Sequence, residues 1–426
     1  MTAKNFVNFH VLISHSPSCL NRDDMNMQKT AVFGGVNRVR ISSQSLKRAM
    51  RMSDYYSAHL GVPSFRTRDL ERAKAELIKL LGKEFDHGLI QEAAIRFVSD
   101  SKDVGDDGEE DSGDDAPGDE DKKKRAVAPW VVDEIREICR AISAVREDGL
   151  TDKERESALK KEGKSVGKGK DKRVLTKEAC MDIAMSQKIG KRLLERIDLL
   201  RTAIGSAVDV ALSGRMATSG VMLSVDGTLA VAHAITTHAV EPQDVDWFTA
   251  VDDLTQDAGE TGAGHLDTQQ FSSGVFYRYA SLNMKQLQVN LGLVPNMKSA
   301  ETTESRKRAL EVATHVFHMF ATVVPSAKQQ SFAAHNPADF AIVSFADQPI
   351  SLANAFEQPV KPAREGGFLH PSTQRLGDYW TSVNRAYGLS ENARAFAVGE
   401  EMKLGGKPAF ASLREIEAWI ENDGQA

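Results

Sequence analysis

The sequence has few cysteines, few aromatic residues and no long apolar run. The sequence has three cysteines, Cys19, Cys139 and Cys180. Their odd number argues against a disulfide scaffold, and their spacing, which does not match that of metal ligands, argues against a cysteine zinc site. No uncharged run approaches the ~20 residues that span a bilayer, and Met1–Ser14 lacks a cleavable signal pattern. We therefore expect a soluble, cytoplasmic protein that does not associate with a membrane and has no metal or other cofactor.

The charge is uneven along the chain, and the formal net charge of -6 hides this. Eleven of the 60 acidic residues lie in 103–121, a segment without Lys or Arg, so the rest of the chain has 49 acidic residues against 54 basic ones. The first 51 residues carry eight Lys or Arg and only two Asp. Such a basic N-terminal region is where a polyanion would bind.

Helical patterns in the first half of the chain indicate an inserted domain. Apolar residues recur at helical spacing in three stretches, which are 68–81, 130–145 and 177–194. We therefore expect a helical domain over 59–200. Within it, 103–125 is rich in Gly, Asp and Glu and is predicted to be disordered, while 151–173 is typical of a charged linker or a frayed helix.

Strand patterns lie on both sides of this helical region. Apolar residues at 7, 9, 11 and 13 alternate with others, as in a strand with one buried face. Further strand patterns occupy 271–282 and 338–345, and a helix pattern at 304–322 separates them. Helices are also expected at 377–387 and 412–422. These split β-α-β pieces predict an α+β fold with a ferredoxin-like, RNA-recognition-like core.

The clearest candidate site is the stretch 42–51, where Ser42 or Ser43 can cap a helix that runs to about residue 59. At 100° per residue, this helix has one polar stripe and one apolar stripe. The polar stripe consists of Gln44, Lys47, Arg48 and Arg51, and the apolar stripe of Leu46, Ala49, Met50 and Leu60.

Cations beside a helix N-terminus suit phosphate. The free N–H groups and serine hydroxyls donate hydrogen bonds, while Lys and Arg neutralise charge. Lys29, Arg38 and Arg40 extend the cationic strip upstream, and a strip of that length suits a polynucleotide backbone better than a mononucleotide. The alternative is an ordinary solvated helix face.

Two further stretches could contact bases. In 213–220, small residues let the backbone approach a ligand closely, and Arg215 and Met216 are the long side chains there; the alternative is a structural turn. Residues 246–249 precede a glycine-containing loop and a strand pattern, so a long hairpin could present Trp247 and Phe248 for stacking on unpaired bases. The alternative for these two residues is a role as core anchors.

Catalytic patterns are weak, and no catalytic residue is assigned. The pairs His233/His238 and His315/His318 lack a convincing third ligand and are expected to be structural. Asp23, Asp24, His10 and His15 could in principle assist RNA cleavage, but capping of the loop or pairing with Arg22 is favoured for the two aspartates.

Five blocks of this sequence together resemble a known family. The blocks are His10–Lys29, Arg38–Arg51, Ala211–Gly220, Asp246–Leu254 and Phe271–Tyr279. They closely resemble the backbone subunit of the type I-E CRISPR Cascade complex, the CasC family.

The resemblance implies a hand-shaped protein with a palm, helical fingers and a thumb hairpin. The implied boundaries are 1–58, 201–240 and 271–426 for the palm with the C-terminal helices, 59–200 for the fingers and 241–270 for the thumb. It also implies residue roles: phosphate contacts for Ser42, Gln44, Lys47 and Arg48 with Lys29 nearby, support of bases by Met216, and a thumb wedge of Trp247, Phe248, Thr249 and Leu266.

The function that follows from the resemblance is non-catalytic. Several copies would polymerise along one CRISPR guide RNA, and kinked base segments would be presented to target DNA in antiviral defence. Guide RNA, the target strand, other copies of the chain and other Cascade subunits are the expected partners. A related ribonuclease that cuts guide precursor or target RNA is the alternative, and a single-strand binder that works alone is a third possibility.

Overall fold

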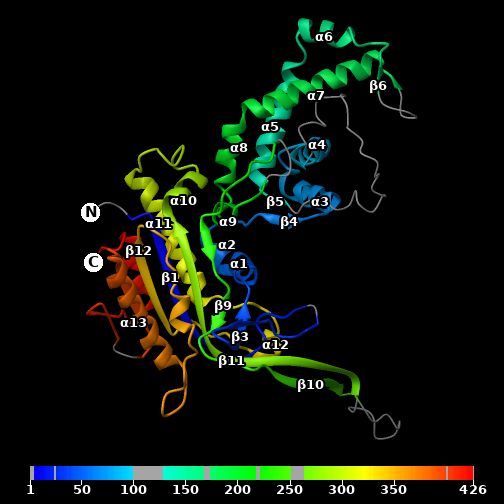
Figure 1. The fold of residues 1–426 in the computed structure, drawn as a ribbon. Helices are drawn as coiled ribbons and strands as arrows, with labels where there is room; N and C mark the ends of the chain where they lie inside the picture. The colour runs from blue at the N-terminus through cyan, green and yellow to red at the C-terminus, as the bar shows by residue number, and fades with distance from the viewer. Residues whose placement is uncertain are drawn as a thin grey trace. The chain divides into compact units, whose positions relative to one another are not determined.

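The structure is a computed structural model that describes residues 4–23, 25–98, 128–166, 173–216, 221–250, 263–399 and 402–425. The predicted acidic segment 103–125 and residue Asp24 lie outside these ranges. The chain divides into two units (Figure 1), which we call the sheet unit and the helical unit. The sheet unit comprises 1–60, 228–288 and 300–426, and the helical unit comprises 61–227 and 289–299.

One antiparallel sheet organises the sheet unit. Its strands in the described part of the chain are β1 (Phe6–Ser18), β2 (Thr30–Phe33), β3 (Val36–Ile41), β8 (Leu229–Val231), β9 (Ala234–Thr236), β10 (Gln243–Ala250), β11 (Ala263–Asn283), β12 (Phe340–Ala346) and β13 (Asn392–Ala397). The strand order is β13-β12-β1-β11-β9-β3-β2, and β8 and β10 also pair with β11. A short hairpin of β14 (Lys403–Leu404) and β15 (Lys407–Pro408) forms a separate two-stranded sheet.

The helices of the sheet unit separate its strands in the sequence. They are α1 (Ser43–Arg51), α2 (Asp54–His59), α10 (Met284–Asn290, whose last two residues fall in the other unit's range), α11 (Thr303–Thr322), α12 (Gln329–Phe332), the 3-10 helix η3 (Ala353–Phe356), α13 (Leu369–Tyr387) and α14 (Leu413–Glu421). The α+β class is therefore confirmed. The neighbouring strands in the series β12-β1-β11-β9 are antiparallel to one another.

Both faces of β1 are covered, which corrects the prediction of a half-buried strand. On one face, the ring of Phe9 lies 5.6 Å from that of Phe317 on α11. On the other face, Leu12 belongs to an apolar cluster with Phe356 of η3 and Leu376 of α13. The segment that covers this second face, residues 350–387, is called the cover segment below. Its contribution could not be anticipated because it lies more than 300 residues away in the sequence.

The covered second face of β1 contains polar side chains that satisfy one another. His10 Nδ1 lies 2.9 Å from the hydroxyl of Tyr277 on β11, and the Tyr279 hydroxyl donates to Asn8 Oδ1 at 3.2 Å. Leu352 N–H of the cover segment donates to the Tyr277 hydroxyl at 3.1 Å. These bonds allow polar groups to be buried at little cost. Burial lowers the pKa of His10 to about 3.

A long hairpin extends from the sheet. The first part of β11 pairs only with β10, with Gln243 opposite Phe271 and Phe248 opposite Leu266, and the rest of β11 pairs with β1. Figure 1 shows β10 and β11 as a two-stranded arm that continues the sheet strand. The paired residues of this hairpin, 243–250 and 263–271, overlap the predicted thumb range 241–270, and β11 continues beyond it.

The helix predicted from residue 43 to about 59 is interrupted. Its first part ends at Arg51, and Ser53 then caps α2 by accepting a hydrogen bond from the Tyr56 N–H at 3.2 Å. The Tyr56 N–H lies in the first turn of α2, where it has no acceptor within the helix. The Ser53 hydroxyl supplies one, which is why Ser is favoured at the N-cap. Leu60 is buried as predicted, but it ends the second helix and does not share a stripe with Met50.

The helical unit has its own core. Its described helices are α3 (Leu70–Leu81), α4 (His87–Val98), α5 (Val132–Asp148), α6 (Asp152–Leu159), α7 (Lys177–Glu195), α8 (Ile197–Ile204) and α9 (Val208–Ser213). Its short strands pair as β4 (Phe65–Thr67) with β5 (Ala128–Trp130) and β6 (Ser165–Val166) with β7 (Arg173–Val174). Helices α3, α4, α5 and α7 pack around an apolar cluster that includes Leu77, Phe97 and Ile138. No described helix of either unit combines the length and apolar character needed to cross a membrane.

Part of the predicted linker 151–173 is ordered. Thr151 and Glu154 form a reciprocal capping box at the start of α6, in which each side chain accepts from the other's backbone N–H. Strands β6 and β7 follow it. The helical unit also ends later than the predicted residue 200, because 201–227 belongs to it.

The buried histidines predict an acid-sensitive fold. Burial lowers the pKa of His10 and of His15 to about 3, whereas both titrate near 6.5 in an unfolded chain. As the pH falls below 6.5, the unfolded state binds these protons and the folded state does not, so stability decreases by about 1.4 kcal/mol per pH unit for each histidine. Urea unfolding between pH 6.5 and 4.5 measures this slope.

Replacing His10 by Gln is expected to make the slope shallower by about 1.4 kcal/mol per pH unit. His335→Gln serves as the matched control, because His335 is exposed. An unchanged slope in His10→Gln would show that His10 already accepts its proton in the folded state.

Candidate nucleic-acid interface

The β2–β3 hairpin brings two of the predicted cations together. Thr30 pairs with Val39 and Phe33 with Val36, so the open end of the hairpin lies at Lys29 and Arg40. The Arg40 N–H donates to the Lys29 carbonyl at 2.9 Å. Both side chains are partly exposed. Residues 11 positions apart in the sequence thus become neighbours at one edge of the sheet unit.

The start of α1 lies directly after this pair. Ser42 is its N-cap, and its hydroxyl accepts from the Ser45 N–H at 3.2 Å. The Ser42 N–H donates to Asn21 Oδ1 at 2.8 Å, a contact that sequence analysis missed and that fixes the cap against the loop after β1. No acidic residue occurs in the first turn, so the positive end of the helix dipole is not neutralised there.

The two stripes of α1 lie as the periodicity predicts. Leu46 and Met50 are buried, while Gln44 and Arg48 are exposed. Lys47 and Arg51 are partly exposed, and Lys47 Nζ donates to the Leu229 carbonyl of β8 at 2.8 Å. The buried stripe anchors the helix, and the other stripe presents cations to solvent.

Three of these cations have no acidic partner among the described residues. The described salt bridges of the sheet unit involve other basic residues, namely Lys4, Arg306, Arg308 and His318. Lys29, Arg40 and Arg48 take part in none of them. The Arg40 guanidinium instead donates to the Thr30 carbonyl at 3.0 Å and lies 3.1 Å from His233 Nδ1. We call Lys29, Arg40, Ser42, Gln44 and Arg48 the cationic site.

Basic side chains of the helical unit, by contrast, often form ion pairs. Many of them pair with carboxylates close by on the same helix, as in Lys74–Glu71, Lys79–Glu76, Arg96–Glu92 and Arg140–Glu137. Such pairs neutralise charge at the surface. The three cations of the cationic site are not neutralised in this way, so the site has a positive potential that attracts an external anion.

Arg38 does not belong to this surface, which corrects its prediction as a phosphate ligand. Its side chain is 0% exposed. The guanidinium donates to main-chain carbonyls of Phe33, Thr236 and Phe356 at 3.2, 3.0 and 2.9 Å. Burial also lowers the pKa of Arg38. Sequence alternation could not show this, because the covering Phe356 lies over 300 residues away.

Arg215 is also buried, which corrects its prediction as a base contact. It forms a two-bond pair with Glu134 of α5, with N–O distances of 2.5 and 2.8 Å. Its Nε donates to the Leu223 carbonyl at 3.0 Å, and the guanidinium lies 5.5 Å from the Phe97 ring centre. Burial raises the pKa of Glu134, and the hydrogen bonds and charge of Arg215 oppose that rise. No sequence signal marked Glu134 as the partner.

Met216 follows this anchored arginine and is 87% exposed. The backbone before it is tight: Gly214 has a φ of +77°, and a Cβ there would lie 2.7 Å from the Val225 carbonyl oxygen. A two-way backbone bridge between Arg215 and Val225 closes the loop. The exposed, apolar side chain of Met216 therefore follows a tightly held stretch of backbone and is available to contact a ligand. Residues 217–220 of the predicted motif lie outside the described residues.

The predicted thumb residues lie on the hairpin. Trp247, Phe248 and Thr249 are on β10, and Leu266 is the cross-strand partner of Phe248 on β11. The side chains of all four lie outside the part of the chain that the structure describes. Their predicted contact with bases therefore stays a prediction.

Comparison with known proteins identifies the family. A model of the CT1975-like protein family matches residues 7–421. The chain belongs to this family. No curated protein matches it.

Two solved structures are similar to this CT1975-like chain over nearly its whole length. One, described as "CRISPR RNA-guided surveillance complex, pre-nicking", is 26% identical with a TM-score of 0.65, covering 99% of this chain and 100% of the other. The second, described as "CRISPR RNA-guided surveillance complex", is 20% identical with a TM-score of 0.51, covering 98% and 99%. At that identity, the second shows likeness of fold alone.

The residues considered for RNA cleavage in this CT1975-like chain have structural contacts. Asp23 Oδ1 accepts from the N–H groups of Met25 and Met27, both at 2.9 Å, so it caps its loop as favoured. His10 and His15 are both 2% exposed. Asp24 lies outside the described residues. Among the described residues, no group of three His, Cys, Asp or Glu side chains could hold a metal ion.

The four histidines of the two pairs that were expected to be structural all contact neighbouring side chains. His233 lies beside Arg40, and His238 stacks on Phe368 with ring centres 3.6 Å apart. His315 Nδ1 lies 3.0 Å from the Tyr55 hydroxyl, and His318 Nδ1 lies 2.7 Å from Glu417 Oε1. His233 was not recognised as a neighbour of the cationic strip.

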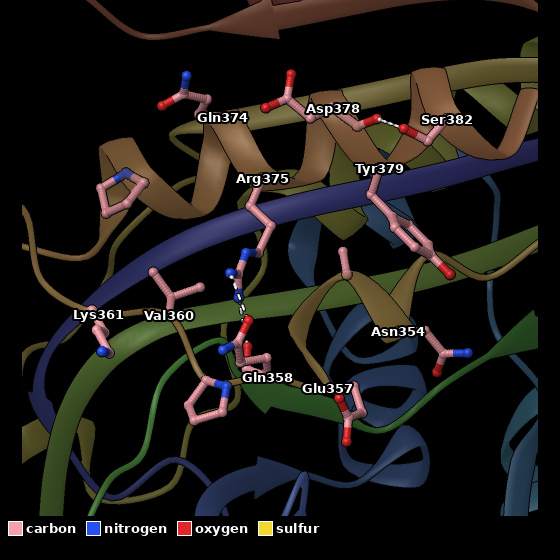
Figure 2. Close-up of a pocket in the computed structure, with 13 residues that line it drawn as sticks. Asn354, Glu357, Gln358, Val360, Lys361, Gln374, Arg375, Asp378, Tyr379 and Ser382 are labelled. Carbon is pink, nitrogen blue, oxygen red and sulfur yellow. Dashed lines mark hydrogen bonds between the residues drawn. The ribbon is translucent and has the colours of Figure 1, made fainter. Parts of the chain in front are cut away.

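A cavity of about 760 Å³ lies between η3 with the residues after it and α13 (Figure 2). Its walls carry both signs of charge, with Glu357 and Asp378 as well as Lys361 and Arg375. Arg375 donates to the Gln358 carbonyl at 2.7 Å, as Figure 2 shows. None of the predicted site residues lines this cavity, and its mixed charge does not suit a polyanion.

The buried pair of Arg215 and Glu134 predicts large and non-additive mutational effects. Arg215→Met leaves a buried carboxylate without its partner and is expected to destabilise the helical unit by about 3–5 kcal/mol, measured by urea unfolding. The double variant Arg215→Met/Glu134→Leu removes both charges and is expected to lose much less. Arg140→Met is the control, since its exposed pair with Glu137 contributes only ~0.5 kcal/mol. Additive losses in the double variant would contradict the coupling.

Proposed function

We propose that the chain is a non-catalytic backbone subunit of a CRISPR RNA-guided surveillance complex that holds the guide RNA by its phosphates. The single observation that carries this is the cationic site, in which Lys29, Arg40 and Arg48 lack acidic partners among the described residues and lie beside a helix N-terminus with no acidic residue in its first turn. Membership of the CT1975-like family and the likeness to chains of such complexes support it.

The chemistry of the cationic site favours backbone contacts over base reading. The N–H groups at the start of α1 and the Gln44 amide can donate to phosphate oxygens, and the three cations neutralise them. Contacts of this kind fix the position of a nucleic acid without reading its sequence. The bases then stay free to pair with a target DNA strand, and that pairing supplies specificity.

The strand order supports an RNA-recognition-like palm, but the mode of binding differs from that of RNA-recognition modules. Those modules stack bases on the exposed face of the sheet. Here the face that carries His10, Tyr277 and Tyr279 lies under the cover segment. The guide RNA would instead pass along the sheet edge, at the β2–β3 hairpin and the start of α1.

The remaining roles rest on the resemblance described above. Met216 would support bases, and Trp247, Phe248, Thr249 and Leu266 would wedge the guide at a kink. Lys47 and Arg51 would add to the phosphate contacts. Several copies would assemble along one guide together with other subunits, and the complex would be of type I-E and act in antiviral defence.

A ribonuclease is the alternative, and the contacts of Asp23, His10 and His15 do not favour it. A chemical step needs a group within reach of the substrate. We expect no cleavage products when the purified protein is incubated with labelled CRISPR RNA, with or without magnesium. Products that disappear in Asp23→Asn would contradict the non-catalytic proposal.

The cationic site predicts a defined dependence of RNA affinity on salt. For a single-strand site that grips three or four phosphates, the slope of log affinity against log salt is expected to be roughly -2 to -3. Replacing Lys29 and Arg48 together by Gln removes two phosphate contacts, so the slope should become shallower by about 1.4. Fluorescence anisotropy with a short single-stranded RNA at several salt concentrations measures both.

The matched control is the double variant Lys79→Gln/Arg140→Gln, which removes two cations of the helical unit that are paired with Glu76 and Glu137. It has the same change in net charge, and we expect an unchanged slope. Equal slopes in all three proteins would place the phosphate contacts elsewhere.

A further inference from the structure

Arg38 is a cation buried in the sheet unit, 0% exposed, with no carboxylate partner among the described salt bridges. Burying a guanidinium is costly unless its donors are satisfied. Here the donors reach only main-chain carbonyls. Nε bonds to Phe33, Nη1 to Thr236, and Nη2 to Phe356, with a longer contact of 3.5 Å to Glu357.

These carbonyls belong to three segments that are far apart in the sequence. Phe33 ends β2 at the hairpin turn, Thr236 ends β9, and Phe356 ends η3 in the cover segment. A planar fork of five N–H groups can reach all three at once, whereas the single ammonium of a lysine cannot. We call Arg38 with these carbonyls the Arg38 joint.

A second contact holds the same parts together. Gly34, at the hairpin turn, has a φ of +62°, and a Cβ there would lie 1.6 Å from the Glu357 carbonyl oxygen. The hairpin turn therefore touches the backbone of the cover segment directly. Gly35, the next residue, has a φ of +75° but nothing within 4 Å of a Cβ.

The Arg38 joint lies close to the cationic site along the chain. Arg38 and Arg40 are two residues apart on β3 and so point to the same side of the strand. Ser42, the cap of α1, follows two residues later, and the Lys29 carbonyl is bonded to the Arg40 N–H. A shift of β3 thus moves Lys29, Arg40 and Ser42 together.

We infer that Arg38 is a positioning residue: it fixes the β2–β3 hairpin against the cover segment so that the cationic site has the spacing of an RNA backbone. This inference rests on the proposed function. It assigns the cover segment a role in RNA binding, although no residue of that segment belongs to the cationic site.

The test uses Arg38→Lys and short single-stranded RNA as the probe. The charge is kept but the joint is lost, so a smaller fraction of molecules has the binding-competent spacing, and the affinity is expected to fall by about tenfold. Each bound molecule still contacts the same phosphates, so the slope of log affinity against log salt stays as in the wild type. Gly34→Ala disturbs the joint without touching any charge and is expected to behave likewise.

Two matched controls accompany these variants. Arg375→Lys changes an arginine of the cover segment that also donates to a main-chain carbonyl, that of Gln358 (Figure 2). Gly35→Ala introduces the same backbone strain as Gly34→Ala without the contact to Glu357. Both are expected to keep wild-type affinity, and circular dichroism melting checks that each variant is folded.

The possible outcomes separate the inference from the proposed function. If wild-type protein binds RNA without salt dependence, the proposed function fails. If the wild type behaves as proposed but Arg38→Lys and Gly34→Ala bind equally well, the inference fails alone. A shallower slope in Arg38→Lys would mean that phosphate contacts themselves are lost, and not only the fraction of binding-competent molecules, which would also overturn the inference. If both variants fail to fold while the controls fold, Arg38 serves the fold itself and not the spacing of the site.

Discussion

The sheet unit depends on strand β1, which is enclosed on all four sides. It pairs with β11 and β12 at its edges, α11 covers one face, and the cover segment lies over the other. The burial of apolar side chains such as Phe9 and Leu12 on both faces is the main favourable term for such an arrangement. Its consequence is functional, because a sheet with no free face at its centre can bind a large ligand only along its edges and hairpins.

The distribution of charge marks one such edge. In the helical unit, many basic side chains pair with carboxylates close by, and even the buried Arg215 has Glu134. At the start of α1, by contrast, partly exposed cations and a helix N-terminus occur without acidic partners among the described residues. Isolated cations of this kind repel one another and cost stability. Their occurrence at one edge is therefore best explained by an anionic ligand, for which we propose a guide RNA.

Periodicity predicted well those parts whose structure is decided locally. The two stripes of α1, the strand around Phe9 and the helix that contains Phe317 follow from residue spacing alone. For 151–173, a charged linker and a frayed helix were both left open, because only Ala158 of helix α6 is buried and the helix has no apolar stripe. The capping pair Thr151 and Glu154 was a usable signal for the helix.

The wrong predictions concern residues whose surroundings come from distant parts of the chain. Arg38 was predicted to extend the cationic strip upstream of α1, and Arg215 was predicted to contact bases from a stretch of small residues. One is buried by Phe356 and the other by Glu134, and neither partner is near in sequence. A single sequence does not show which segment will cover a strand. Both arginines therefore support neighbouring residues and are not the ligand contacts that were predicted.

The central claim, that the cationic site holds a guide RNA in a particle of several subunits, is tested most directly by native mass spectrometry of the particle purified from its own cells. The account predicts a particle that contains several copies of this chain and one RNA of defined length. A protein recovered as a single chain without nucleic acid, in a buffer of low salt, would contradict it.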